Sequence, residues 1–88
     1  MKITIKSKNA TAVIDTLGAE LKSFTDNNSG KDYIWCGDPE HWSGTSPLLF
    51  PIVGNLRDGK TIIHQKEYQI PKHGFVRERY FSAVSLSL

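Results

Sequence analysis

The side chains best suited to chemistry lie in and just after the stretch Thr45–Phe75. Asn55, Arg57 and His73 fall at predicted strand ends or in loops, where a rigid scaffold usually holds binding groups. A planar guanidinium suits the holding of a hydroxyl or a phosphate, and a histidine exchanges protons near neutral pH. With Arg77, these residues are the candidate binding set for a polar ligand.

Each candidate also has a purely structural interpretation. Asn55, Arg57 and His73 are ordinary turn residues in sequences of this kind. Arg77 follows a predicted loop and can pair with a nearby carboxylate, as many surface arginines do. Residue type alone leaves both interpretations open.

Other chemistries fail on spacing. The three histidines and the single cysteine, Cys36, are scattered and match no zinc pattern. The chain has no nucleophile elbow of the Gly-x-Ser-x-Gly kind and no phosphate-cradling glycine loop. We therefore expect no metal and no cofactor, and no residue of the chain is assigned a catalytic role.

Composition narrows the class further. The chain has 88 residues, 39% of them hydrophobic, which suits a single domain or the N-terminal segment of a larger one. One cysteine favours a reducing compartment. The formal net charge is +2, with lysines and arginines scattered singly, so no basic stripe for nucleic acid is present. No signal peptide or membrane-length apolar run is found. We expect a cytoplasmic protein that binds neither nucleic acid nor membrane.

Alternation of apolar and polar residues predicts an all-β chain, part of a sandwich or barrel. The segment 19–25 fits helical or strand spacing, and its neighbours favour a strand. A turn is expected at 26–31, and a loop or single helical turn at 37–42. Cys36 is expected to be buried, Trp35 and Trp42 to pack in the core or at its rim, and His41 and His64 to lie at the surface. The expected strands are Lys2–Lys6, Ala10–Thr16, Ala19–Thr25, Asp32–Cys36, Lys60–His64, Glu67–Ile70 and the alternating run Arg79–Leu88, with hairpins joining the first two and, across Gln65–Lys66, the fifth and sixth.

Several short blocks recur in a fixed order over most of the chain. They are Gly18–Phe24 (GAELKSF), Tyr33–Trp35 (YIW), Trp42, Ser46–Gly54 (SPLLFPIVG), Tyr68 and His73–Arg77 (HGFVR). In order and spacing these blocks resemble the N-terminal region of the aldose 1-epimerase (galactose mutarotase-like) family, and its bacterial LacX-like branch in particular.

The resemblance implies a β-supersandwich in which a sugar binds in a cleft on a concave sheet, in proteins several times longer than this chain. It implies that His73 matches a histidine that holds the sugar near its ring oxygen. Asn55 stands where many relatives have a sugar-contacting arginine, and the nearest guanidinium here is Arg57. The family's catalytic histidine and its glutamate base lie downstream of the matched region.

Three hypotheses about function follow. The first is an aldose 1-epimerase-like protein acting on hexose anomers, represented by an N-terminal portion that is inactive alone; its ligand is a hexose or a hexose phosphate. The second is a non-catalytic carbohydrate-binding β-sandwich. The third is a fragment that associates through an open β edge, at the run Arg79–Leu88, with another β-rich chain.

Overall fold

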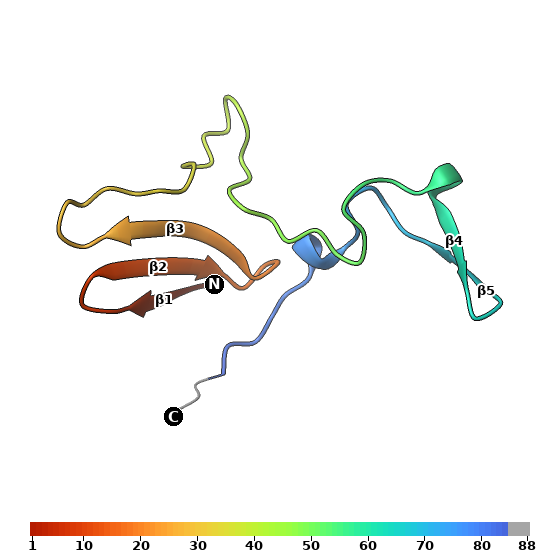
Figure 1. Ribbon diagram of the computed structural model, residues 1–88, viewed down its shortest axis with the longest axis horizontal. Coiled ribbons are helices and arrows are strands. Elements are labelled where there is room, and N and C mark those ends of the chain that lie inside the picture. The colour runs from red at the N-terminus through yellow and green to blue at the C-terminus, as the bar shows by residue number, and fades with distance from the viewer. Residues whose placement is uncertain (85–88) are drawn as a thin grey trace.

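The computed structural model describes residues 1–84 and consists of strands, short 3-10 turns and loops. It confirms the predicted all-β class. A three-stranded sheet and a two-stranded hairpin lie at opposite ends, with a 3-10 turn between them (Figure 1). The elements are β1 (Lys2–Lys6), β2 (Ala10–Asp15), β3 (Glu20–Asp26), η1 (Arg57–Gly59), β4 (Lys60–Ile63), β5 (Lys66–Gln69) and η2 (Val76–Glu78).

The N-terminal sheet has the order β1-β2-β3, with antiparallel pairing throughout. Ile3 pairs with Ile14, and Ile14 pairs in turn with Leu21, so an apolar row crosses the sheet. A register shift between Val13 and Ile14 bends β2. Segment 19–25 is therefore a strand, as predicted, because its apolar residues complete a face that the first hairpin begins.

The second hairpin pairs Lys60 with Gln69 and Ile63 with Lys66. Its turn residues are His64 and Gln65, with φ of 49° and 67°. Two successive residues with positive φ suit the right-handed twist of a tight hairpin. The predicted pairing is confirmed, although the turn lies one residue earlier than the predicted Gln65–Lys66.

Two predicted strands are wrong. In the segment Asp32–Cys36 only Asp32 pairs, through an isolated bridge to Thr25. The Asp32 carboxylate instead accepts hydrogen bonds from the backbone N–H groups of Phe24 (3.2 Å) and Ile34 (3.0 Å), and such local bonds compete with a strand ladder. Cys36, expected to be buried, is exposed.

The predicted strand Arg79–Leu88 is also absent over residues 79–84, and its last residues, 85–88, lie outside the described part of the chain. Tyr80 forms one bridge to Leu17, and the N–H of Phe81 donates to the carbonyl of Thr16 at 2.8 Å. Beyond that point the segment leaves the sheet. An alternating pattern reports that one face is to be covered, but residues 1–84 supply no neighbouring strand here.

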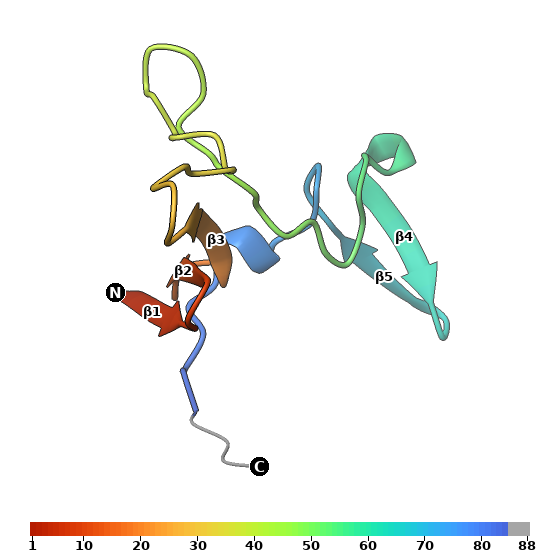
Figure 2. The same ribbon diagram turned by 60° about the vertical axis from the view of Figure 1, so that its left-hand side comes forward.

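Apolar side chains find little cover within residues 1–84. Ile70, 9% exposed, is the one apolar side chain there that is buried, whereas Val53 is 69% exposed and Ile62 72%. The radius of gyration is 16.6 Å, against about 12 Å for a compact domain of this length. Figure 2 shows the β4–β5 hairpin standing apart from the sheet. The two β units therefore share no core of their own.

No helix among residues 1–84 has the length and apolar character needed to cross a membrane.

Candidate functional site

The candidate site is built on a junction between two loops. The loop around Phe50–Gly54 lies against the loop Pro71–Phe75, with Phe50 and Gly74 forming a parallel bridge. The carbonyl of Phe50 accepts from the N–H of Phe75 at 2.9 Å and from that of Val76 at 3.3 Å. Gly74 is buried with φ 75°, and a Cβ there would overlap the Phe50 carbonyl. Only glycine fits this contact.

His73 projects from this junction. Its backbone takes a positive φ of 68°, and its N–H donates to the carbonyl of Gly54 at 2.8 Å. The ring atom Nδ1 contacts the carbonyl of Val53. Because a carbonyl only accepts, Nδ1 carries the proton in this contact. The other ring nitrogen, Nε2, is thereby left to accept from a ligand hydroxyl when the ring is neutral or to donate when it is charged.

Asn55 follows directly on the residues that hold His73. It is exposed and lines a shallow hollow of about 470 Å³ together with Asp58, Gln69 and Pro71. The hollow thus extends from the loop after Gly54 to the start of the His73 loop. Asp58 and Gln69 were not singled out from the sequence, because nothing in their local pattern distinguishes them from solvated turn and hairpin residues.

The two arginines lie differently. Arg57 opens η1 and lines a neighbouring hollow beside Lys60 and Glu67, so it does not share the Asn55 hollow. Arg77 is half-buried in η2, directly after the His73 loop. The ion pairs formed among residues 1–84 do not include Arg77, so the carboxylate partner suggested for it is not found there.

Gly18 lets η2 sit against the N-terminal sheet. It has φ 73°, as its role as a strand breaker predicts, and a Cβ there would lie 2.7 Å from the carbonyl oxygen of Arg77. Its N–H donates to the carbonyl of Arg79 at 2.6 Å. The position of Arg77 is therefore fixed by the first β-turn of the chain.

Glu20 ties the loop that precedes the site to β3, a role the sequence did not reveal. Its Oε2 accepts from the N–H of Thr45 (2.7 Å), the hydroxyl of Thr45 (2.6 Å) and the N–H of Ser46 (3.2 Å). Lys22 Nζ lies 3.4 Å away. Burial alone raises the pKa of this carboxyl, but the Thr45 and Ser46 hydrogen bonds and Lys22 outweigh it and hold the pKa below its ordinary value.

The tryptophans lie at the rim. Trp35 and Trp42 are exposed, and Trp35 Nε1 donates to the Trp42 carbonyl at 2.7 Å. The His41 ring packs edge-on against Trp35, with centroids 6.1 Å apart. His41 and His64 are exposed, as predicted. Asp38 caps the intervening turn through a 3.0 Å bond from the N–H of Glu40. This aromatic turn leads into the Thr45 segment that Glu20 holds.

Comparison with known proteins places the whole chain. The model of the aldose 1-epimerase family matches residues 1–87, and the chain belongs to this family. Two LacX proteins of Lactococcus lactis subsp. lactis, one plasmid-encoded and one chromosomal, are 40% and 39% identical over 87 residues. Each alignment covers 93% of this chain and 29% of the relative.

Solved structures agree with the family assignment. A galactose mutarotase-like protein from Lactobacillus casei superimposes with a TM-score of 0.90 at 32% identity, over 99% of this chain and 30% of that protein. A galactose mutarotase related enzyme from Lactobacillus acidophilus superimposes with a TM-score of 0.87, also at 32% identity. The fold is therefore part of a galactose mutarotase-like β-sandwich, and the chain spans about 30% of the length of the relatives it matches.

Proposed function

We propose that residues 1–88 form one wall of a hexose-binding cleft in an aldose 1-epimerase-like protein. The observation that carries the proposal is the fixed imidazole of His73, whose Nδ1 contact with Val53 leaves Nε2 for a ligand. Asn55, two residues beyond Val53, lies in the adjoining hollow. A sugar hydroxyl or ring oxygen is the kind of group that such a pair of polar side chains recognises.

Epimerisation at the anomeric carbon needs two proton transfers. A base takes the proton from the anomeric hydroxyl, an acid protonates the ring oxygen, and the opened aldehyde rotates before the ring closes. In the proposal, His73 holds the sugar near its ring oxygen, Asn55 binds a hydroxyl, and Arg57 and Arg77 add charge that suits a hydroxyl or a phosphate. No carboxylate near His73 is assigned as the base, so the proton-transfer pair comes from the part of the family's fold outside this chain.

The isolated chain is expected not to accelerate mutarotation. Without an assigned base, a bound sugar has no partner for the first proton transfer. Polarimetry of fresh α-galactose and α-glucose, corrected for the buffer rate, measures this. Lactococcus lactis LacX under the same conditions is the comparison. A rate above buffer that scales with the concentration of the 88-residue chain contradicts the assignment.

Binding itself is tested in a chimera in which residues 1–87 replace the aligned part of Lactococcus lactis LacX. His73→Ala in this chimera is expected to weaken hexose binding about tenfold or more, the loss of one directed hydrogen bond at a partly buried site. The midpoint of thermal unfolding is expected to change little, because His73 is only half-buried.

His64→Ala is the matched control, since His64 is an exposed histidine with positive φ in the β4–β5 turn. Calorimetric titration with galactose, glucose and a hexose 6-phosphate gives the affinities. Equal affinities in the two variants remove His73 from the site. A chimera that binds hexose through His73 but leaves the polarimetric rate at the buffer value favours the non-catalytic sugar-binding function instead.

A further inference from the structure

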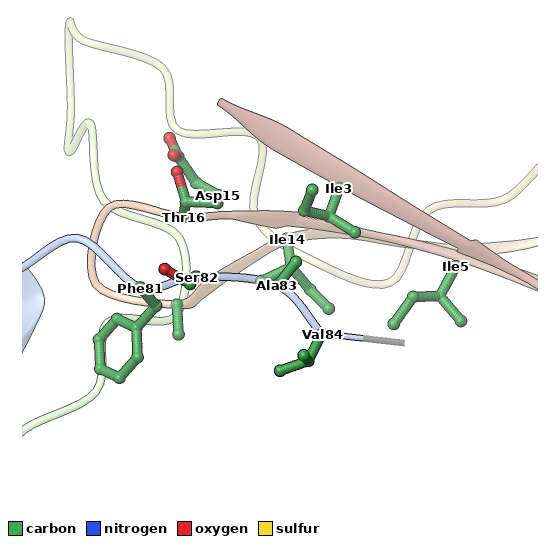
Figure 3. A pocket seen from close by; sticks show the side chains of 10 residues that line it. Ile3, Ile5, Ile14, Asp15, Thr16, Phe81, Ser82, Ala83 and Val84 are labelled. Carbon is green, nitrogen blue, oxygen red and sulfur yellow. The ribbon is translucent and has the colours of Figure 1, made fainter. Parts of the chain in front are cut away.

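An apolar groove runs along the N-terminal sheet, away from the candidate sugar site. We name it the isoleucine groove after Ile3, Ile5 and Ile14, which line it with Phe81, Ala83 and Val84. Its volume is about 560 Å³. Figure 3 shows the three isoleucines on β1 and β2, with residues 81–84 running past them. Ile5 is 56% exposed and Val84 88%, so the groove is open to solvent over much of its length.

The polar groups beside the groove do not suit a small ligand. The Thr16 hydroxyl donates to the carbonyl of Met1 at 3.0 Å. The Asp15 carboxylate accepts from the N–H of Leu17 at 3.0 Å and lies 3.8 Å from the N-terminal ammonium. Small-molecule sites combine apolar walls with a few polar groups that fix the ligand's orientation. Here those groups are already engaged, so the groove fits apolar side chains of a polypeptide.

The backbone beside the groove fits the same kind of occupant. β1 is an edge strand of the sheet, because it pairs with β2 alone. An edge strand presents unpaired N–H and C=O groups that accept a further strand. A formal net charge of +2 on the chain gives little electrostatic attraction, so apolar contact and strand pairing dominate at this surface.

The comparisons indicate which polypeptide covers it. The chain keeps the family fold over 99% of its length, yet corresponds to only 30% of the solved mutarotase-like protein. The relatives therefore contain more than two thirds of their length that has no counterpart here. That remainder is the natural cover for an apolar face that residues 1–84 leave open.

We propose that the isoleucine groove and the free edge of β1 bind the remaining β-strands of a mutarotase-like sandwich in trans, without a peptide link between the two parts. The proposal concerns this surface and not sugar binding, so it stands or falls independently of His73 and Asn55. Folding of the chain and docking are then one process, because the groove is formed by side chains that the chain alone cannot cover.

The test uses two purified polypeptides: the 88-residue chain, and the part of Lactococcus lactis LacX that lies beyond its aligned 87 residues. Mixing them is expected to give a stable equimolar complex by size-exclusion chromatography with light scattering. Amide hydrogen exchange in β1 and β2 is expected to slow in the mixture. Absence of a complex overturns the proposal, and so does a dimer of the 88-residue chain that persists when the LacX part is added.

Two substitutions on the same strand separate docking from general effects. Ile5→Glu places a charge in the groove, whereas Thr4→Glu places one on the opposite face of β1. Ile5→Glu is expected to weaken the complex by about tenfold or more relative to Thr4→Glu, the effect of losing one buried apolar side chain. Equal affinities for the two variants, measured by titration of the LacX part, show that the groove is not the docking surface.

Discussion

Gly74→Ala is expected to destabilise the LacX chimera by about 2–5 kcal/mol and to abolish its hexose binding. Two effects add. The residue has φ 75°, which strains any residue with a Cβ, and the new Cβ would overlap the carbonyl of Phe50 and the nitrogen of Pro51. The loops must separate to relieve the overlap, and the bonds from Phe75 and Val76 to Phe50 are then lost. His73 loses its seat beside Val53 in the same movement.

Gly30→Ala is the matched control for this prediction. Gly30 has nearly the same φ, 74°, but a Cβ there meets nothing within 4 Å. It therefore shows the backbone strain alone, about 1–2 kcal/mol. Urea unfolding gives the free energies of unfolding, and calorimetric titration gives the affinities. If Gly74→Ala and Gly30→Ala destabilise the chimera equally, the contact between the two loops does not support the site.

The sequence predicts those strands whose partners lie nearby in the chain. The pairing of Ile3 with Ile14 and of Lys60 with Gln69 joins segments separated by short turns. In such hairpins the period-two pattern and the turn residues specify the same register. This local agreement is why the first sheet and the second hairpin could be derived with small errors in their bounds.

The errors occur where the pattern depends on something outside the local sequence. Tyr80 and Phe81 belong to an alternating run, yet after their contacts with Leu17 and Thr16 the segment through residue 84 has no strand beside it. Cys36 looks like a core residue by type, but it is exposed in a segment where Asp32 bonds its own neighbours. Alternation and residue type describe the cover that a side chain needs and do not say where that cover is.

The candidate site divides in the same way. The loop position of His73 is readable from Pro71 and Gly74, which mark a turn. The contact of its Nδ1 with Val53 is not readable, because it joins loops 20 residues apart with no periodic pattern between them. Glu20 is a stronger case. Its partners Thr45 and Ser46 are 25 and 26 residues away, and a single glutamate in a strand carries no signal of them.

Glu20→Gln is the second substitution with a large expected effect. The side chain is 12% exposed, and its carboxylate accepts from Thr45 and Ser46. Hydrogen bonds to a charged group contribute about 1.5–3 kcal/mol each, and the amide keeps one acceptor but loses the charge and the attraction of Lys22. We expect the chimera to lose about 2 kcal/mol of stability at pH 7. The Ser46 segment leading to Phe50 is expected to become more mobile, which hydrogen exchange detects.

The pH dependence distinguishes the charge from the shape of this side chain. The pKa of Glu20 is lower in the folded protein than its ordinary value of 4.5, so the ionised carboxyl favours folding. Its contribution is fully present above pH 4.5 and is lost as the pH falls through the lower folded value. The stability difference between the parent chimera and Glu20→Gln should therefore be largest near neutral pH and shrink in acid. Urea unfolding at a series of pH values measures it, with Glu40→Gln, an exposed glutamate, as control. A difference that stays constant into acid assigns the role of Glu20 to packing, because only an ionised carboxylate makes the tie between β3 and the Thr45 loop depend on pH.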